Sequence, residues 1–380
     1  MNRAISMQAV VLREPGRPVS VETVLLDRPR PDEVLVRVAA AGVCHSDVHL
    51  ADGLLGDGRW PMVLGHEGAG VVEAVGERVA GLAPGDHVVF SLVPSCGACG
   101  PCRSGRPTLC EPAGVAGMAG TLMDGTSRLR AADGASLQHG FMVACFAQHA
   151  VLPAAGAIRL PSEVPLWQAA LVGCGVVTGI GAVKRAGVGI GDSVAVIGCG
   201  GVGLQVIAGA RLAGAARIVA IDREADKLGR ARHRGATHVV DAARGDAVER
   251  VRALTGGGVE HAFEVVGSPA TIRQAWDVLR PGGTVVVVGV APRGAEVSLP
   301  AIELLSEKTI TGSYYGSADV GSAIAGITEL LLDGRLELDD VVSHVVSLDG
   351  VQAAFERLRR GEGARSVVVI DEQLAGRNGS

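Results

Sequence analysis

Four cysteines lie close together in the first third of the chain. They follow the pattern C-x2-C-x2-C-x7-C within fifteen residues, at Cys96, Cys99, Cys102 and Cys110. Glycines and a proline between them allow a loop to fold around a tetrahedral ion. Four thiolates complete the coordination of zinc and leave no position open for a substrate. The pattern predicts a structural zinc site, with a redox-active dithiol or an iron–sulfur cluster as the alternatives.

A glycine-rich sequence indicates a nucleotide site. A predicted strand over 192–197 is followed by the motif G-x-G-x-x-G, whose residues include Gly198, Gly200, Gly201, Val202 and Gly203. The glycines allow a tight turn and let the backbone approach a pyrophosphate at the start of the predicted helix that follows. The alternative is a glycine-rich helix cap that binds no ligand.

The residue at the end of the next predicted strand bears on the choice of nucleotide. This strand, 217–222, ends at Asp222, nineteen residues past Gly203. Asp222 would accept hydrogen bonds from the adenosine ribose hydroxyls and repel a 2′-phosphate, which favours NAD over NADP. The neighbouring Arg223 would suit a phosphate, but Asp222 occupies the end of the strand.

Polar residues at three other places offer metal ligands or proton-transfer groups, although their spacing alone is not diagnostic. They are Cys44, Ser46, Asp47 and His49, then His66 and Glu67, and finally Cys174. Taken singly, a buried cysteine is usually a small apolar residue, and a lone histidine is usually a hydrogen-bonded core residue. The residue pattern therefore leaves metal binding here open.

The elements that must position these residues fall into three regions. Up to about residue 176 the short apolar runs 21–26, 33–43 and 68–76 are typical of β-structure. From about residue 187, strands expected at 192–198, 217–222, 237–241, 260–267 and 283–289 alternate with helical stretches, which predicts a doubly wound parallel sheet. After about residue 317 we expect helices over 322–336 and 351–361, strands over 341–348 and 365–371, and a disordered tail over 372–380.

Composition limits the class of protein. The 380 residues allow two domains, 48% are hydrophobic, 55 are glycine, and the net charge is -5. A nucleic-acid binder would need clustered basic charge, so nucleic acid is not expected as a partner. A membrane is not expected as a partner either, for the reason given next. We expect no apolar run close to the roughly 20 residues that span a bilayer, and no secretory signal, which predicts a cytoplasmic protein.

Over nearly its whole length the chain resembles the zinc-dependent medium-chain alcohol dehydrogenases, in the longer branch that carries a structural zinc. The motifs that carry the resemblance are GVCHSDVH (42–49), GHEGAGVV (65–72), PGDHVV (84–89), CGACGPCRSGRPTLC (96–110), DGTSR (124–128), GCGVVTGIG (173–181), GCGGVG (198–203) and ARSVVV (364–369). The resemblance implies an α/β fold, with a GroES-like β-rich catalytic domain (1–176 and 317–380) and a Rossmann domain that binds NAD (177–316).

The resemblance also implies roles for single residues. Cys44, His66 and Cys174 would hold a catalytic zinc with an open fourth position, so that each subunit binds two zinc ions. Ser46 and His49 would pass the proton of the alcohol to solvent, Asp47 would orient His66, and Glu67 would lie behind the metal. Around the cofactor and the substrate it implies a further set: His45 (an arginine in many relatives), Thr178, Lys227, Val266, Val290 and Arg365 at the cofactor, and Leu92 and Phe141 in an apolar substrate pocket.

Within this family the segment 111–139 resembles the longer loop of the animal- and plant-like branch, so a homodimer is expected and a homotetramer is the alternative. The expected reaction is reversible hydride transfer between a primary or secondary alcohol and NAD. Glutathione-dependent relatives carry an arginine shortly after the fourth structural cysteine, whereas residues 111–114 here contain no base. A thiol-adduct formaldehyde dehydrogenase or a polyol dehydrogenase is the alternative enzyme. A nucleotide-sensing or zinc-buffering protein is the non-enzymatic alternative.

Overall fold

The computed structural model describes residues 4–55 and 60–376. The chain divides into two compact units, residues 1–174 with 319–380, and residues 175–318. The boundaries expected from the sequence, 176/177 and 316/317, lie two residues from these. Each unit is described by itself.

The first unit contains two β-structures. A closed barrel has the strand order β1-β2-β7-β8-β4, and a seven-stranded sheet has the order β10-β6-β5-β3-β18-β17, with β9 paired to β3. The barrel strands are β1 (Ile5–Leu12), β2 (Ser20–Leu26), β4 (Met62–Val63), β7 (Leu129–Ala131) and β8 (Ser136–His139). The sheet strands are β3 (Glu33–Val43), β5 (Glu67–Val75), β6 (His87–Phe90), β9 (His149–Pro153), β10 (Ala157–Leu160), β17 (Val342–Val346) and β18 (Arg365–Val369).

Strand β3 is the centre of this sheet, and its neighbours bring the polar residues together. Its side chains are buried except for that of Arg37, as its nearly continuous run of apolar residues predicts. β3 ends at Val43, directly before Cys44, and Gly42 pairs with Glu67 at the start of β5. Ser366, next to Arg365, pairs with Val43. Three segments that are distant in sequence therefore meet at one end of β3.

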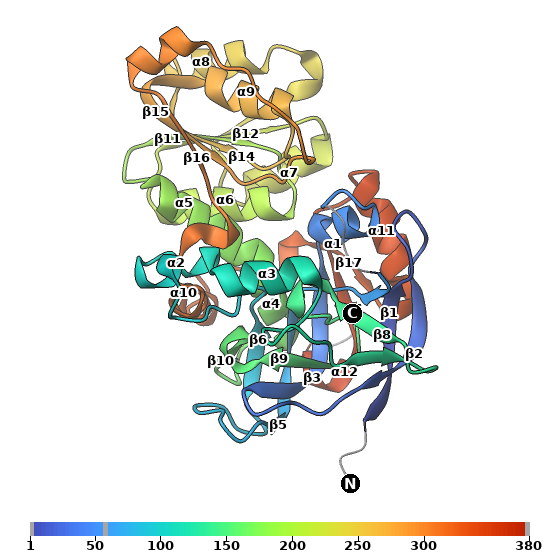
Figure 1. Cartoon of the computed structure of the whole chain (residues 1–380). Coiled ribbons are helices and arrows are strands. Elements are labelled where there is room, and N and C mark those ends of the chain that lie inside the picture. The colour runs from blue at the N-terminus through green and yellow to red at the C-terminus, as the bar shows by residue number, and fades with distance from the viewer. Residues whose placement is uncertain (1–3, 56–59, 377–380) are drawn as a thin grey trace. The chain divides into compact units, whose positions relative to one another are not determined.

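The helices of the first unit lie mainly in connections and at the C-terminal end of the chain. They are α1 (His45–Ala51), α2 (Gly100–Arg103), α3 (Glu111–Ala119), α4 (Leu166–Leu171), α10 (Val320–Leu332), α11 (Val351–Arg359) and α12 (Glu372–Ala375). α11 packs beside α1 (Figure 1). Arg359 at the end of α11 forms an ion pair with Asp52, the C-cap of α1.

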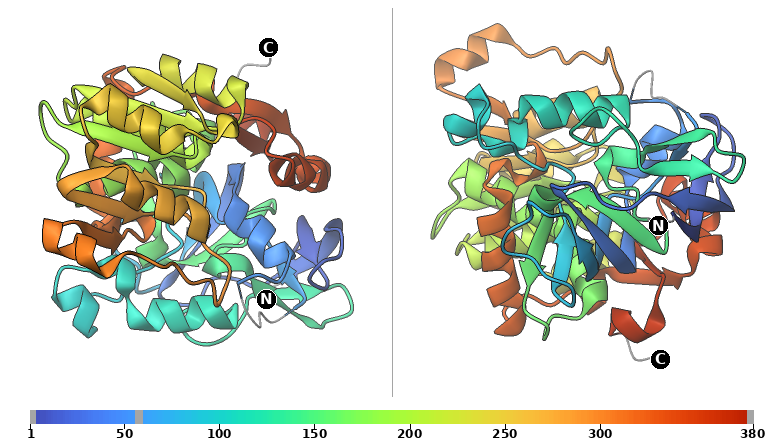
Figure 2. Two further views of the ribbon diagram at one scale, coloured as in Figure 1. Left: turned by 90° about the horizontal axis from the view of Figure 1, so that it is seen from above. Right: turned by 60° about the horizontal axis from the view of Figure 1, so that its bottom comes forward.

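The prediction of a disordered tail over 372–380 is wrong for its first part. Glu372–Ala375 forms α12, because Asp371 caps it by accepting hydrogen bonds from the N–H groups of Gln373 and Leu374. The short red helix beside the C-terminal label in the right-hand view of Figure 2 is α12. Residues 377–380 lie outside the described residues.

The second unit is the predicted doubly wound sheet, with strand order β13-β12-β11-β14-β15-β16 and all neighbouring pairs parallel. Its strands are β11 (Ser193–Ile197), β12 (Arg217–Asp222), β13 (His238–Asp241), β14 (Val259–Glu264), β15 (Leu279–Val287) and β16 (Thr309–Gly312). Its helices are α5 (Val177–Ala186), α6 (Gly201–Leu212), α7 (Ala225–His233), α8 (Ala247–Thr255) and α9 (Pro269–Asp277). α8 and α9 cover one face of the sheet, and α5 and α6 lie on the other (Figure 1). The sequence analysis missed β16, which is short and largely exposed.

One helical stretch contradicts the expectation that no apolar run approaches 20 residues. Residues 164–183 carry no charged side chain. Within the described residues, Leu166–Ala186 forms a continuous 21-residue helical run that is long and apolar enough to cross a membrane, but 83% of its most apolar window is buried inside the protein. A π-helical turn, Val172–Val176, interrupts this run between α4 and α5.

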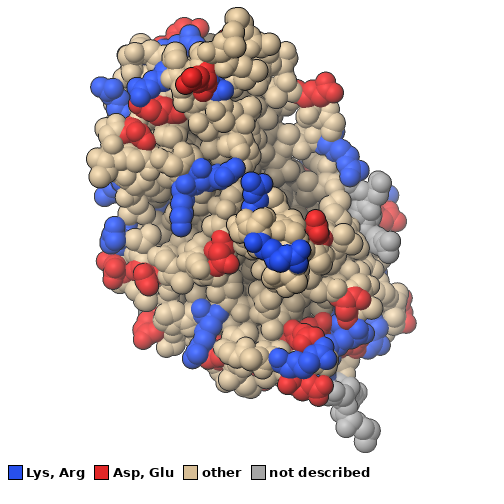
Figure 3. All heavy atoms as spheres, turned by 60° about the vertical axis from the view of Figure 1, so that its left-hand side comes forward, with Lys and Arg blue, Asp and Glu red and all other residues tan. Residues whose placement is uncertain are grey.

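On the face drawn in Figure 3, basic and acidic side chains are interspersed.

Candidate active site and metal centres

A buried cluster of metal-ligating side chains forms at the end of β3. One ligand atom each from Cys44, His66, Glu67 and Cys174 lie within 4.8 Å of one another, and all four residues are buried. Cys44 follows β3, His66 precedes β5, and Cys174 lies in the π-helical turn. π turns inside helices are frequent at functional sites, because the extra residue re-aims a side chain. Thus, the structure brings together the three residues expected to hold a catalytic zinc.

The imidazole of His66 is oriented for a metal. Its Nδ1 lies 3.1 Å from Oδ1 of Asp47, and the same oxygen accepts the N–H of Gly65 at 3.1 Å. The Nε2 atom is buried and has no hydrogen-bond partner among the residues that the structure describes. Burial of an unpaired nitrogen is costly unless a ligand occupies it, and a carboxylate on Nδ1 leaves the Nε2 lone pair free for a metal. The donor set therefore fits a zinc ion.

The two cysteine thiols of the cluster shift each other's pKa in opposite directions. A hydrogen bond with Cys174, followed by the contact with His66, lowers the pKa of the Cys44 thiol well below its ordinary value. The same hydrogen bond, together with burial, raises the pKa of Cys174. A thiolate is thus already favoured at Cys44, and thiolates are the form that binds zinc.

Glu67 and Arg365 form a buried ion pair behind these ligands. The guanidinium of Arg365 donates to Oε1 of Glu67 at 3.0 Å and to the carbonyl oxygen of Val43 at 3.2 Å. Burial raises the pKa of Glu67 to about 7, in spite of the nearby guanidinium. Burial opposes the charge of Arg365, but Glu67, Cys44 and Cys174 raise its pKa. Arg365, expected near the pyrophosphate, pairs with Glu67 through Nη1 only, and its Nη2 has no hydrogen-bond partner among the described residues.

Helix α1 carries the residues expected to move a proton. Ser46 Oγ lies 3.7 Å from Cys44 Sγ, and His49 is half-buried in the last turn of the same helix. Residues three apart lie on one face of a helix, so both can serve one path from the cluster toward solvent. His45 is exposed, and its ring centroid lies 6.2 Å from that of His49.

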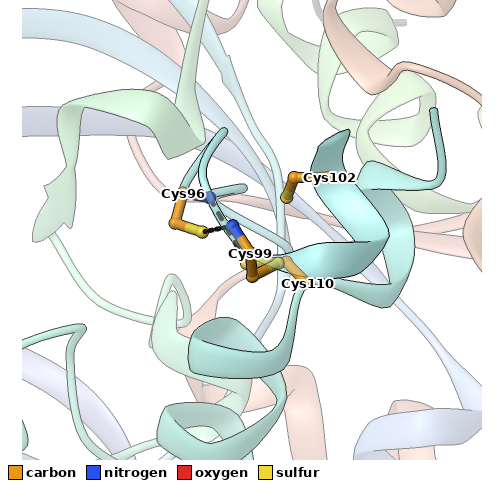
Figure 4. A group of neighbouring side chains, drawn as sticks. All are labelled: Cys96, Cys99, Cys102 and Cys110. Carbon is orange, nitrogen blue, oxygen red and sulfur yellow. Dashed lines mark hydrogen bonds between the residues drawn. The ribbon is translucent and has the colours of Figure 1, made fainter. Parts of the chain in front are cut away.

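The second cysteine cluster also has the geometry of a zinc site (Figure 4). The sulfur atoms of Cys96, Cys99, Cys102 and Cys110 lie within 4.8 Å of one another. Four sulfurs placed 2.3 Å from an ion at tetrahedral angles would be about 3.8 Å apart. The N–H groups of Ala98 and Cys99 donate to the sulfur of Cys96 at 3.4 and 3.3 Å, and they lower the pKa of this thiol to about 6. The side chains present therefore fit a structural zinc.

The glycine-rich turn of the second unit has the form of a pyrophosphate cradle. A Cβ atom on Gly203 would lie 1.9 Å from the carbonyl oxygen of Gly198, so only glycine fits there. A Cβ on Gly200, the N-cap of α6, would meet nothing within 4 Å. The open space lies in front of the first N–H groups of α6, which include those of Gly201 and Val202 and which have no partner inside the helix.

Asp222 connects this turn to the next strand. One carboxylate oxygen accepts the N–H of Cys199 at 2.8 Å, and the other accepts the N–H groups of Arg223 and Glu224 at 2.7 and 3.0 Å. The negative charge is thereby fixed at the end of β12, beside the glycine-rich turn. Arg223 is exposed and Lys227 is half-buried on α7.

A buried carboxylate that the sequence analysis missed organises the neighbouring loops. Oε1 of Glu264, at the end of β14, accepts the N–H groups of Val266 and Gly267 at 2.8 and 2.7 Å and the hydroxyl of Thr271 at 2.8 Å. A Cβ on Gly198 would lie 2.7 Å from a methyl of Val266, so this loop packs on the glycine-rich turn. A Cβ on Gly267 would lie 2.4 Å from the carbonyl oxygen of Val290, so the backbone at Val290 also packs closely on this loop. The only sequence signal is an acid directly after the apolar pair Ala262 and Phe263.

Comparisons with known proteins agree with this geometry. The family model described as the alcohol dehydrogenase GroES-like domain matches residues 30–162, and that of the zinc-binding dehydrogenase matches residues 201–329. An S-(hydroxymethyl)glutathione dehydrogenase of Paracoccus denitrificans is 36% identical over 371 residues, which cover 95% of this chain and 99% of the relative. An NDMA-dependent alcohol dehydrogenase of Amycolatopsis methanolica is 39% identical over 368 residues, covering 95% and 98%. The solved benzyl alcohol dehydrogenase of Acinetobacter calcoaceticus has a TM-score of 0.91 and 31% identity, and the match covers 96% of this chain and 99% of that one.

This chain belongs to the zinc-dependent medium-chain alcohol dehydrogenase family. The expected fold, a GroES-like domain with a Rossmann domain, is confirmed, as is the assignment as an oxidoreductase of the alcohol dehydrogenase class. The remaining expected residues of this alcohol dehydrogenase lie in both units. In the first unit, Leu92 is buried after β6, and the Phe141 ring contacts that of His66 edge-on, with 4.7 Å between centroids. In the second, Thr178 is half-buried in the first turn of α5.

The DGTSR motif of the alcohol dehydrogenase resolves into a buried ion network. Arg128 is only 2% exposed, and its guanidinium donates to Glu33 at 2.6 and 2.9 Å and to Asp124 at 2.6 Å. Thr126 accepts a further hydrogen bond from Arg128 at 2.6 Å. The sequence did not indicate this network, because Glu33, the main partner of Arg128, lies 95 residues away.

Proposed function

We propose that this enzyme uses two zinc ions and NAD to oxidise uncharged, largely apolar primary or secondary alcohols reversibly to aldehydes or ketones. The observation that carries the proposal is the buried cluster of Cys44, His66 and Cys174, in which Nε2 of His66 has no hydrogen-bond partner within residues 4–55 and 60–376. Two thiolates and one imidazole leave one position for a substrate oxygen, as in catalytic zinc sites.

The residues of the chain have separable tasks in this proposal. The chemistry supplied by a zinc ion in the cluster is Lewis-acid polarisation that makes the alcohol hydroxyl more acidic, and NAD supplies the hydride acceptor. Ser46 accepts the proton of the alcohol and donates its own onward, because a hydroxyl can do both. His49 releases the proton to solvent, and Asp47 holds His66 in the tautomer that keeps Nε2 free.

Variants of α1 test this proton path. Ser46→Ala should lower kcat by ~10²-fold or more, since a positioned proton acceptor contributes that much. His49→Gln should lower it less, because water substitutes at the exposed end, and added buffer bases should restore part of the rate. Alcohol oxidation by His49→Gln at the wild-type rate at pH 7, with an unchanged pH profile, would show that His49 has no part in the relay.

NAD is proposed over NADP because Asp222 places a carboxylate beside the glycine-rich turn. His45 is proposed as a pyrophosphate contact, with Arg365 approaching the same group from β18. Thr178, Val266 and Val290 are proposed near the nicotinamide, and Lys227 near the adenosine ribose. The Gly198–Gly203 turn would receive the pyrophosphate.

The proposed substrate class is supported by apolar side chains, of which Phe141 contacts the imidazole of His66. Leu92 and Phe141 are apolar, and helix α3 exposes Val115 and Met118 directly after the structural cysteines. The acidic Glu111 begins α3 where an arginine would hold the carboxylate of a glutathione adduct. Because one relative is named for S-(hydroxymethyl)glutathione, a thiol adduct is the second candidate substrate.

A substrate panel decides between these candidates. The purified enzyme should be assayed with ethanol, benzyl alcohol, a secondary alcohol, a polyol and S-(hydroxymethyl)glutathione, each with NAD and NADP, and its zinc content measured by elemental analysis. We expect two zinc ions per chain and the highest kcat/KM for an apolar alcohol with NAD. Turnover of the glutathione adduct alone would select the second candidate, and no turnover with any substrate would reject the proposal.

We further propose a homodimer that forms at the edge strand β16. This strand pairs only with β15 among the described strands, and it exposes Ile310. Ile302 and Leu305, in the turn before it, are 73% and 82% exposed. An open edge with apolar side chains favours pairing with another chain. Sedimentation should give a dimer that Leu305→Lys weakens; a tetramer, or a monomer, would contradict this.

A cytoplasmic location is proposed because all eight cysteines are free thiols. Six of them belong to the two predicted zinc sets, and zinc ligation requires reduced thiols. Fractionation of cells with an antibody against the chain tests the location.

A further inference from the structure

We propose that the Asp124–Arg128 motif, acting through His139, holds Phe141 against the ligand His66 and so sets the shape of the substrate side of the catalytic centre. His139 and the motif are positioning residues in this inference, since neither touches a reacting atom. The inference rests on the proposed function where it is tested by the choice between alcohol substrates. A second, independent test measures the loss of zinc from the metal site.

The motif provides a rigid starting point. Arg128 and Glu33 are both buried, and two hydrogen bonds between them, at 2.6 and 2.9 Å, pair the guanidinium with the carboxylate side by side. Asp124 accepts from the same guanidinium and also forms an ion pair with Arg30. Buried charges that are fully paired in this way have little freedom to move, because any displacement leaves a charge without its partner.

His139 connects this network to the catalytic centre. The backbone N–H of Arg128 donates to Nε2 of His139 at 3.1 Å, and the N–H of His139 donates to the carbonyl oxygen of Gly120 at 2.8 Å. His139 is only 1% exposed, and burial, together with Arg128, lowers its pKa to about 3. The ring therefore stays neutral and can serve as an acceptor, so that both its backbone and its side chain are fixed.

The residues that follow His139 lie directly on the segment that carries His66. A Cβ on Gly140 would lie 2.8 Å from the carbonyl oxygen of Val63, so the backbones are in close contact. Farther along, the N–H of Cys145 donates to the carbonyl oxygen of Gly65 at 3.0 Å. The segment 139–145 is thus attached near both of its own ends to the residues that directly precede His66.

Phe141 lies between these attachments in an unfavourable conformation. Phe141, Met142 and Ala144 have φ angles of 50°, 61° and 55°, the left-handed region that side chains other than glycine rarely adopt. Such a run persists only where its surroundings hold it, and here its product is the edge-on contact of the Phe141 ring with His66 at 4.7 Å. Release of His139 should allow the segment to relax and the ring to leave His66.

A motif with a purely structural role would also be buried. The test therefore needs readouts that do not change when only the stability of the fold changes. The first is the ratio of kcat/KM for benzyl alcohol to that for ethanol. The second is the rate at which the catalytic zinc is lost to a chelator, measured on the holoenzyme with a metal-sensitive dye. Phe141 covers one side of His66, and its displacement should change the ratio and speed the loss of zinc.

The variants are His139→Leu, which removes the acceptor, and His139→Gln, which offers an amide oxygen near the position of Nε2. Arg130→Gln is the matched control, because Arg130 lies two residues from Arg128 in β7 but pairs with Asp27 on the surface. We expect about a tenfold change of the ratio and faster zinc loss in His139→Leu, a several-fold smaller change in His139→Gln, and none in the control. In a Phe141→Ala background, His139→Leu should add nothing further, because its effect passes through that ring.

Several outcomes would overturn the inference. One is that His139→Leu lowers thermal stability while the ratio and the zinc-loss rate stay at wild-type values. Another is that the effects of His139→Leu and Phe141→Ala simply add. If His139→Leu does not fold, Thr126→Val takes its place, because this variant loses one hydrogen bond from Arg128. We then expect smaller changes of the substrate ratio and of the zinc-loss rate, in the same direction. If the wild-type enzyme oxidises no alcohol, the proposed function fails, and the zinc-loss arm decides the inference by itself.

Discussion

The neutral, buried imidazole of His139 should make the enzyme lose stability in mild acid. In the folded protein Nε2 of His139 accepts the N–H of Arg128, and the pKa of the ring is lowered to about 3 by burial and by Arg128. In the unfolded chain the same ring has a pKa of about 6.5. The unfolded state therefore binds a proton more readily than the folded state.

The sign and size of the effect follow from these two values. A lowered histidine pKa stabilises the fold fully above pH 6.5, and this contribution is lost as the pH falls from 6.5 toward 3. Between pH 7.5 and pH 5.0 the free energy of unfolding should fall by ~2 kcal/mol because of His139 alone. The loss would approach ~5 kcal/mol only near pH 3.

Urea unfolding of wild type and His139→Gln at pH 7.5, 6.5, 5.5 and 5.0 measures this contribution. Glutamine keeps an acceptor but does not titrate, and all other groups titrate alike in the two proteins. We expect His139→Gln to be less stable at pH 7.5 and the difference to shrink by ~2 kcal/mol at pH 5.0. A difference that stays constant over this range would refute the reasoning, because it would mean that His139 is protonated alike in both states.

Three further predictions concern the two metal centres and the nucleotide site. Cys44→Ala should abolish turnover but leave a folded protein. Cys99→Ala should lower the unfolding temperature and the zinc content together, because structural zinc contributes to folding. Equal unfolding temperatures of Cys99→Ala and wild type would argue against a structural ion. NAD should be preferred over NADP by at least about tenfold in kcat/KM, a difference of only ~1.4 kcal/mol, and Asp222→Gly should narrow the gap mainly by weakening NAD; equal efficiency of the wild type with both cofactors would reverse the assignment. Glu264→Gln should raise the Kd for NAD about fivefold. The reason is that hydrogen bonds from the N–H groups of Val266 and Gly267 to a charged oxygen stabilise the loop by ~1 kcal/mol more than those to a neutral oxygen. An unchanged Kd in titrations of NAD would show that these loops do not depend on the charge of Glu264.

Some parts of this protein could be predicted from sequence because the signal is local. The cysteine cluster spans fifteen residues, and the glycine-rich motif is followed by a helix and an acid within one βαβ unit. In such cases the chain between the functional groups is too short to place them far apart. Strand periodicity was equally local, and the five expected strands of the second unit form β11 to β15. The apolar stretch around Cys174 shows the limit, since composition does not distinguish a buried core helix from a membrane span.

Tertiary structure decided what lies between distant segments. Cys44, His66 and Cys174 have no diagnostic spacing, and sequence alone joined them only through the family resemblance. Pairing of β3 with β5 and β18 brings Glu67 and Arg365 to the end of β3, and a π turn aims Cys174 at the same point. No sequence signal indicated that Glu33 would pair with Arg128 or that His139 would accept the backbone N–H of Arg128. The free energy of such contacts depends on burial and on hydrogen-bond partners, and these exist only once strands remote in sequence have come together.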